Sequence, residues 1–235
     1  MDKHRTIYLI SIGVLSVIAI LSLINSNYFL VTEIEIVGNK LLSDEYIVNF
    51  SKVKDINIFK IDRQEIAKRL LGLQQVKGVA VKRDLPNKLI LEINERRPVA
   101  IVGLKSSYQI IDNQGWVIAT SKNLAEWDLP LITGVKIANH DDKVKFTTEL
   151  KLAIDYLDLL SDQILKEVSE LNISKDKGIE LYLLGGGVVK LGKKFDTKTK
   201  AQIFISVYND LKSQAKKVKY IDLRYKNNTV VKLEK

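Results

Sequence analysis

The stretch that decides the fold is FLVTEIEIVGNKLLSDEYIV, residues 29–48 of a 235-residue chain. Isoleucine and glutamate alternate within it, and this period of two predicts a half-buried strand over residues 32–37. The Gly-Asn pair that follows supplies a turn, because both residue types tolerate a positive φ. Ser43 then stands where it can cap a helix whose first turn holds Asp44 and Glu45, in favourable register with the helix dipole. A folded domain therefore begins here, directly after a long apolar run.

That apolar run, IYLISIGVLSVIAILSLI at residues 7–24, contains no charged side chain. At a rise of about 1.5 Å per residue, ~18 helical residues span roughly 27 Å, which is enough for the core of a bilayer. A buried helix of a soluble protein would need a large protein around this end of the chain. A signal peptide usually has a shorter apolar region followed by an A-x-A-like cleavage site, and no such site follows here. The run therefore predicts an uncleaved transmembrane helix.

The flanks of the run predict its orientation. Lys3, His4 and Arg5 precede it, whereas the residues that follow it, 25–27, are uncharged. Because basic flanks stay in the cytoplasm, we expect a cytoplasmic tip at residues 1–6 and an extracytoplasmic location for everything after the span. The expected location is the cell (inner) membrane, crossed once.

The first domain continues to about residue 98. Asp62 is placed to cap a second helix, which carries an apolar stripe at positions i, i+4 and i+7. Two alternating segments, 76–83 and 88–95, flank a Leu-Pro-Asn turn and predict a hairpin. The order strand-helix-helix-strand-strand allows two helices to cover one face of a three-stranded sheet.

The rest of the chain predicts a mixed β-domain with two helices, over residues 147–165 and 196–215. Turns are expected at residues 112–115, where the sequence is Asp-Asn-Gln-Gly, and at the three glycines of residues 185–187. Short strands are expected at residues 99–104, 108–111, 116–119, 168–174, 179–184, 188–191, 220–225 and 229–233. The fold class predicted for the whole chain is α+β.

The composition excludes some kinds of site and partner. The formal net charge is +9 and the chain contains no Cys, so disulfides and thiolate metal sites are excluded. Lysines are densest at residues 193–200 and 212–219. No nucleic-acid-binding motif accompanies them, so nucleic acid is not an expected partner. A lysine-rich helix face is usually a solubilising surface, and the alternative is a weak contact with anionic lipid or wall polymer.

Candidate catalytic side chains are few. The two histidines are His4, beside the span, and His140, in a polar loop. No G-x-S-x-G segment offers a nucleophile for a histidine base. Asp141 and Asp142 could be imagined as a glycosidase pair acting on the cell wall, but nothing in the pattern fixes them to a cleft. These residues therefore favour a solvated loop over a catalytic centre.

The glycine-rich segment from Gly187 to Lys193 is similar to the sequence motif of a phosphate-binding loop. Lys194 stands where such a loop requires Ser or Thr, and the residues between the glycines predict a strand rather than a curled loop. A hairpin turn is the favoured interpretation. From the whole pattern we predict no catalytic residue, no metal site, no cofactor and no enzymatic activity.

A series of short motifs runs through both domains. The first domain contains IEIVGN, NIFKID, a hairpin with Leu-Pro at its turn, and ERRPVA at residues 95–100. The second contains LPLITG, VSEL, LYLLGGGVVKLG and YIDLRY. In this order they resemble the FtsQ/DivIB family of bacterial cell-division proteins, over about residues 5–233. The resemblance implies a single membrane anchor at residues 7–24, a POTRA domain at 29–98 and an FtsQ-type β-domain at 99–235.

The resemblance also implies a function. FtsQ/DivIB proteins are non-enzymatic scaffolds of the divisome at the septum, and the C-terminal end of their β-domain is associated with binding FtsB/DivIC and FtsL. A strand at a sheet edge can accept a strand from such a partner, whereas an edge blunted by lysines would repel one. Carried to this sequence, the partner-binding candidates are Arg224, Tyr225, Lys226, Asn228, Thr229, Val230 and Val231.

A second, weaker contact is expected at the first strand of the POTRA domain, through Ile34, Ile36 and Val37. Two other functions stay open at this stage: a membrane-anchored extracellular wall hydrolase, and a POTRA-containing secretion or assembly scaffold. An outer-membrane assembly factor is not favoured, because the chain has one POTRA-like unit and no set of barrel strands.

Overall fold

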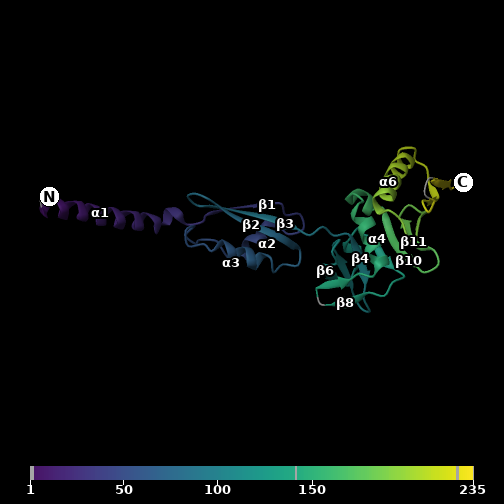
Figure 1. Ribbon diagram of the computed structural model, residues 1–235, viewed down its shortest axis with the longest axis horizontal. Coiled ribbons are helices and arrows are strands. Elements are labelled where there is room, and N and C mark those ends of the chain that lie inside the picture. Colours follow the sequence, from purple (N-terminus) through teal and green to yellow (C-terminus); the bar gives the residue numbers. More distant parts are fainter. Residues whose placement is uncertain (1–2, 141, 226–227, 235) are drawn as a thin grey trace. The chain divides into compact units, whose positions relative to one another are not determined.

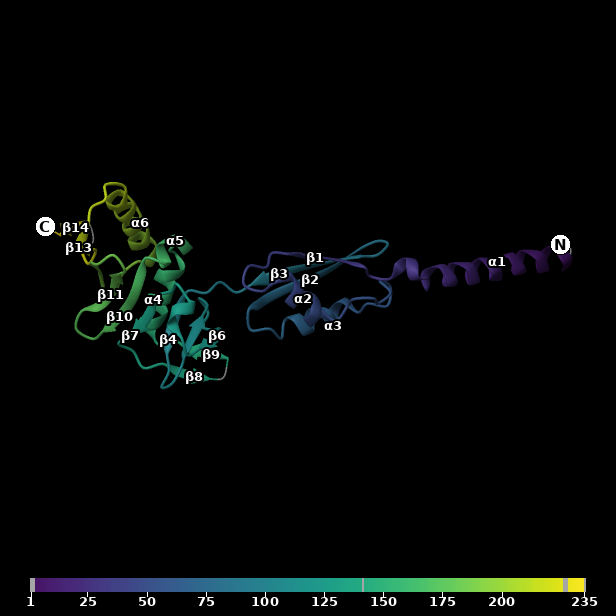
Figure 2. The same cartoon turned by 180° about the vertical axis from the view of Figure 1, so that it is seen from behind.

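The computed structural model describes residues 3–140, 142–225 and 228–234. Its contacts divide the chain into two compact units, and the boundary in the sequence lies between Arg96 and Arg97. Figure 1 and Figure 2 trace the chain through both units from opposite sides, and each unit is described by itself below.

The first unit begins with the helix α1 (Lys3–Ile24), which contains the predicted apolar span. Its segment Arg5–Ile24 has a mean hydropathy of 2.7, and none of that segment is buried. Among the described residues it is the one helix that is long and apolar enough to cross a membrane. A single turn of 3-10 helix, η1 (Asn27–Phe29), leads from it into the folded part of the unit.

The folded part of the first unit is a three-stranded sheet with two helices. The strands are β1 (Glu33–Val37), β2 (Val76–Asp84) and β3 (Lys88–Glu95), in the order β1-β3-β2. The central strand β3 runs parallel to β1 and antiparallel to β2. The helices α2 (Asp44–Ser51) and α3 (Arg63–Leu70) lie between β1 and β2 in the chain. The predicted order β-α-α-β-β is thus confirmed.

The predicted caps and turn have the expected geometry. The Ser43 side chain accepts a hydrogen bond from the Tyr46 amide at 3.3 Å, and Asp62 accepts from the Gln64 amide at 2.9 Å. Gly38 has φ +91°, and a Cβ there would collide with the carbonyl oxygen of Ile93 on the neighbouring strand. Only glycine therefore fits this turn.

The second unit is built on a nine-stranded sheet in the order β14-β13-β12-β11-β10-β7-β4-β5-β6. Its strands are β4 (Ala100–Gly103), β5 (Tyr108–Ile111), β6 (Val117–Ser121), β7 (Leu131–Thr133), β10 (Val168–Ser174), β11 (Gly178–Leu183), β12 (Val188–Gly192), β13 (Val218–Asp222) and β14 (Val230–Leu233). A separate two-stranded pair consists of β8 (Ala138–His140) and β9 (Lys143–Lys145). The helices are η2 (Leu124–Glu126), α4 (Thr148–Asp158), α5 (Asp162–Leu165) and α6 (Thr197–Ser213).

Several predicted elements have other bounds in the structure; the strand expected from residue 229, for example, begins at Val230. The helix expected over residues 147–165 is broken into α4 and α5, and Ser161 caps the second piece by accepting from the Ile164 amide. Arg97 holds the break, because its guanidinium donates to the carbonyl oxygens of Asp158 and Leu160 at 2.9 and 2.6 Å. The strand expected over residues 220–225 is β13, which begins at Val218 and ends at Asp222.

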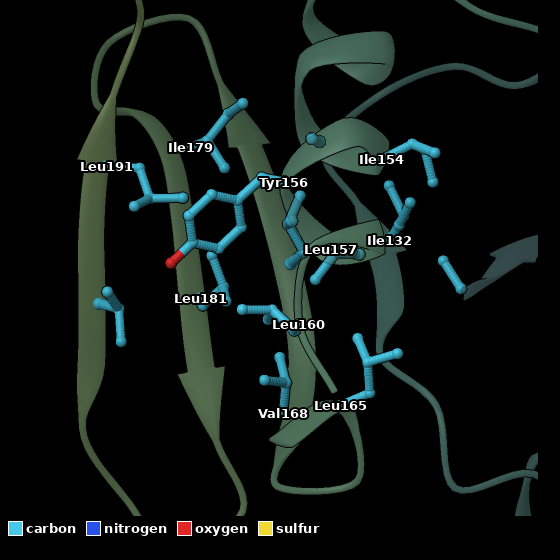
Figure 3. Close-up of a cluster of buried hydrophobic side chains, with 14 of the residues drawn as sticks. Ile132, Ile154, Tyr156, Leu157, Leu160, Leu165, Val168, Ile179, Leu181 and Leu191 are labelled. Carbon is cyan, nitrogen blue, oxygen red and sulfur yellow. The ribbon is translucent and has the colours of Figure 1, made fainter. Parts of the chain in front are cut away.

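The core of the second unit lies where α4 and α6 meet the sheet. Tyr156, Leu157 and Phe204 of these helices are fully buried against strand residues such as Leu181 and Val189. Figure 3 shows the Tyr156 ring pointing between the strands that carry Leu181 and Leu191. With this core the helices stabilise β10 to β13, and so position the strand that ends the sheet.

Candidate functional site

The strand β14 forms one edge of the nine-stranded sheet, next to β13. The two strands are antiparallel, with Val230 opposite Asp222 and Val231 opposite Ile221. All four β14 residues are exposed, and the exposed fractions of Val230 and Val231 are 43% and 37%. Exposed valines on an edge strand are a surface to which another strand can be added.

The hydrogen-bond register shows which β14 amides face outward. The Glu234 amide donates to the Lys217 carbonyl oxygen at 3.0 Å. Along an antiparallel strand the direction of the amides alternates, so the amides of Val230 and Lys232 also face β13. Those of Val231 and Leu233 therefore face away from the sheet, where they can donate to the carbonyl groups of an added partner strand.

The connection from β13 to β14 begins with a charged pair. The Arg224 guanidinium donates to both carboxylate oxygens of Asp222, with Nη2 to Oδ2 at 2.6 Å and Nε to Oδ1 at 2.9 Å. Asp222 is 5% exposed, and its carboxylate also accepts from the Arg224 amide at 3.1 Å. These hydrogen bonds from Arg224 lower the pKa of Asp222, and the same contact raises the pKa of Arg224. The pair lies where β13 ends, at Asp222.

A cavity of about 630 Å³ opens beside this connection. It is lined from one side by the residues after β13 and from the other by the start of α6. The lining residues are Lys194, Phe195, Asp196, Thr199, Lys200, Ile203, Leu223, Arg224, Tyr225, Asn228 and Thr229. Basic side chains outnumber the single acid among them, and four of the others are apolar or aromatic. This lining suits a partner segment that carries both apolar and acidic side chains.

Two charged side chains in the cavity lining, Lys200 and Asp196, form hydrogen bonds to nearby backbone groups. The Lys200 ammonium donates to the Leu191 carbonyl oxygen at 2.8 Å and lies 5.1 Å from the centre of the Phe195 ring. Burial lowers the pKa of Lys200. Asp196 caps α6 by accepting from the Thr199 amide at 2.7 Å, and its hydrogen bonds to Thr199 lower the pKa of its carboxyl group. These two charges shape the wall of the cavity.

Six of the seven residues predicted for partner binding fall in this region. Arg224, Tyr225, Asn228 and Thr229 line the cavity, and Val230 and Val231 lie on β14. The seventh, Lys226, lies outside the described residues. The sequence did not point to residues 194–203 as the opposite wall. Its one signal there was the density of lysines over residues 193–200, which is more often a solvated surface.

The second predicted contact, on β1, is only partly exposed. The strand β1 is an edge of the three-stranded sheet, but Ile34 and Ile36 are half-buried against the core of the first unit. Val37 is exposed, at 45%. On the outer face Lys88 forms ion pairs with Glu33 and Glu35, which raise its pKa.

The glycine-rich segment forms a hairpin turn. The strands β11 and β12 pair antiparallel on either side of it, and Gly187 has φ +92° with no room for a Cβ next to the Val218 carbonyl oxygen. The prediction of a turn here is confirmed. His140 was expected in a polar loop but is the last residue of β8, where it pairs with Lys143 of β9. Asp141 lies outside the described residues. Within the described ranges no cluster of three His, Cys, Asp or Glu is placed to bind a metal ion.

Comparison with known proteins matches both units. Residues 100–224 match the family described as "Cell division protein FtsQ/DivIB, C-terminal", and residues 29–96 match "POTRA domain, FtsQ-type". The cell division protein FtsQ of Geotalea daltonii is 30% identical over 216 residues, which cover 88% of this chain and 77% of that protein. FtsQ of Syntrophotalea carbinolica is 29% identical over 238 residues, covering 97% and 84%. A solved structure of the major extracytoplasmic domain of DivIB from Geobacillus stearothermophilus is 17% identical, covers 51% of this chain and 97% of its own, and has a TM-score of 0.37.

Proposed function

Because this chain belongs to the FtsQ/DivIB family of cell division proteins, we propose that it is a non-enzymatic scaffold of the division complex. In this proposal it binds FtsB/DivIC-like and FtsL-like single-span proteins, and so holds the proteins of septal wall synthesis together. The family consists of division proteins and is not a known enzyme family.

The observation that carries the proposal is the exposed edge of β14. Its outward amides and carbonyl groups are backbone groups, so they can pair with a partner strand of many sequences. The exposed side chains of Val230 and Val231 add apolar contact on the two faces of the sheet. The adjoining cavity supplies specificity, since Arg224, Tyr225 and the α6 segment can receive side chains that flank the added strand.

The proposed location follows from α1. We place residues 1–6 in the cytoplasm, residues 7–24 across the membrane, and both folded units outside, at the division septum. The basic flank at Lys3 and Arg5 and the family's membrane anchor support this orientation. Partners anchored in the same membrane would then meet β14 at a high effective concentration.

The test uses the full chain in lipid nanodiscs with FtsB/DivIC-like and FtsL-like proteins from the same genome. Backbone hydrogen exchange is measured with and without the partners. We expect the partners to bind and to slow exchange at the outward amides of Val231 and Leu233. Binding without protection in residues 230–233 would overturn strand addition, and absence of binding would overturn the partner assignment. Release of soluble fragments from purified cell wall would contradict the non-enzymatic role.

A further inference from the structure

The last turn of α1 is attached to the folded part of the first unit by a buried side chain. Asn57 is 7% exposed, and its Nδ2 donates to the carbonyl oxygen of Ile24, the last residue of α1, at 2.7 Å. This carbonyl has no partner within the helix, so the bond acts as a cap. The loop around Asn57 is thereby fixed at the C-terminal end of the helix.

Backbone hydrogen bonds bring two more segments to the same end. The Ile58 amide donates to the Phe29 carbonyl at 2.7 Å, which joins this loop to the last residue of η1. The Thr32 amide donates to the Asn87 carbonyl at 3.1 Å, and the Arg83 guanidinium donates to the Ile61 carbonyl at 2.6 Å. The turn between β2 and β3 therefore also lies at the end of the unit that adjoins α1 (Figures 1 and 2).

Large apolar side chains of all three segments are exposed to solvent. They are Tyr28 of η1, Ile56 and Phe59 of the loop around Asn57, and Leu85 of the turn between β2 and β3, with exposed fractions of 65%, 38%, 41% and 57%. We call these four residues the collar. Residues 52–60 also carry three exposed lysines, Lys52, Lys54 and Lys60, against one aspartate. Exposed apolar and aromatic side chains together with exposed lysines are typical of a surface that contacts a membrane.

We propose that the collar is a lipid-contact surface, which inserts into the interfacial layer of the bilayer that α1 crosses. The proposal rests on the proposed role of α1 as a membrane span. Tyr28 follows the end of α1 by four residues that continue in helical turns, so at about 1.5–2 Å per residue it lies roughly 6–8 Å beyond the end of α1. The headgroup layer on each side of a bilayer is roughly 5–8 Å thick, so Tyr28 and the segments bonded next to it reach it.

The chemistry of the collar fits a lipid surface with anionic headgroups. Tyrosine rings are favoured at the depth of the headgroups, phenylalanine and aliphatic side chains suit the boundary between headgroups and acyl chains, and the nearby lysines are attracted to lipid phosphates. The Phe29 ring, 4.9 Å from the Phe59 ring, supports the collar from behind. Contact at three segments would fix the tilt of the first unit against the membrane.

The experiment exploits the absence of Cys from the chain, because each single Cys carries one nitroxide label. The full chain is reconstituted in vesicles of phosphatidylcholine and phosphatidylglycerol. Labels are placed at Lys60→Cys beside the collar, at Gly13→Cys in α1, where no atom lies within 4 Å of an added Cβ, and at Leu71→Cys. Leu71 is 46% exposed and follows α3, in the segment that enters β2 at the end opposite to the turn between β2 and β3. Collision rates with oxygen and with a water-soluble nickel chelate report depth.

We expect the Gly13 label in the bilayer core, the Leu71 label in water, and the Lys60 label between them, with nickel collisions at least about fivefold fewer than at Leu71. A Lys60 label as accessible as the Leu71 label, with Gly13 still in the core, would overturn the collar alone. A water-exposed Gly13 label would overturn the proposed span, and the collar with it.

A second variant separates the collar from simple proximity to the membrane. The Lys60 label is measured again in a chain with Tyr28→Ser, Ile56→Ser and Leu85→Ser, whose folding is checked by circular dichroism. We expect nickel collisions at Lys60 to rise toward the Leu71 value. No change would overturn the role of the collar. Protection of Lys60 in cells but not in vesicles would show a protein occupant instead of lipid, and would also overturn the proposal.

Discussion

At the scale of single residues, Tyr156 places a hydroxyl group inside an apolar core. The residue is 0% exposed, and its hydroxyl has no hydrogen-bond partner among the described residues. Burial raises the pKa of this phenol, because the charged form would have no water around it. An unpaired buried hydroxyl lowers the stability of the unit that contains it.

We therefore expect Tyr156→Phe to stabilise the second unit by about 1 kcal/mol. The measurement is urea unfolding followed by tryptophan fluorescence, which reports on this unit because Trp116 and Trp127 both belong to it. The matched control is Tyr182→Phe, whose hydroxyl donates to Glu180 at 3.5 Å and is half-buried. A lower stability of Tyr156→Phe than of the control would show that the hydroxyl is satisfied after all.

Asp222 leads to a prediction on pH. Its pKa is lowered by the hydrogen bonds from Arg224, so the native state binds a proton less readily than the unfolded chain. The resulting stability is present above the ordinary aspartate pKa of about 3.9, and is lost as the pH falls through the lower folded-state pKa. We expect Asp222→Asn to destabilise the second unit by about 1–3 kcal/mol at pH 7.

The difference between wild type and Asp222→Asn should shrink as the pH falls from 5 toward 2. Other carboxylates titrate in the same range in both proteins, so only this difference isolates Asp222. Unfolding curves at several pH values measure it. A difference that stays constant across this range would mean that the ion pair with Arg224 does not stabilise the fold.

At the scale of elements, the sequence predicted well those features that rest on local chemistry. The caps at Ser43 and Asp62 and the turn at Gly38 were found because side chain and backbone act within a few residues of each other. The strands β7, β8 and β9 have three residues each, too few for an alternating pattern to be recognised. The break between α4 and α5 was missed because Arg97, which holds it, lies about sixty residues away in the chain.

The sequence predicted only that part of the candidate site which the end of the chain forms. The terminal strand and the residues before it carry a recognisable pattern, including the charged and aromatic pair Arg224 and Tyr225. The edge position of β14 depends on the order of nine strands, in which β13 lies parallel to β12 after the long helix α6. The opposite wall of the cavity comes from that helix, and no local pattern in residues 194–203 indicates that it meets the end of the chain.

The register of β14 gives a sharp test of strand addition. Thr229 lies before the strand, so a proline there probes the strand only indirectly. Val231→Pro removes an amide that faces away from β13 and leaves the bonds between the two strands in place. We expect it to weaken partner binding at least about tenfold, since each lost hydrogen bond and the ring's obstruction act on the added strand.

The matched control is Val231→Ala, which shortens the side chain and keeps the amide. We expect it to weaken binding only about two- to fivefold, because apolar contact is lost and backbone pairing is not. Affinity is measured with the full chain in nanodiscs and a soluble fragment of the partner. Equal effects of Pro and Ala would indicate recognition by the side chain, and would count against strand addition.

At the scale of the whole molecule, the role of α1 can be separated from that of the folded units. None of the segment Arg5–Ile24 of α1 is buried, and the Asn57 side chain ties the last residue of α1 to the folded part. If α1 serves to anchor, its main contribution is to raise the effective concentration of β14 near partners in the same membrane. The identity of its side chains would then matter little.

We therefore expect a chain whose residues 7–24 are replaced by an unrelated single-span helix to support division, whereas a chain without residues 1–24 does not. Each chain replaces the native copy, and cell length is measured by microscopy. Filamentous cells are expected for the deletion, because dilution away from the membrane lowers partner occupancy even though both folded units are intact. A span replacement that filaments as severely as the deletion, at equal protein level, would show that α1 itself contacts a partner within the membrane.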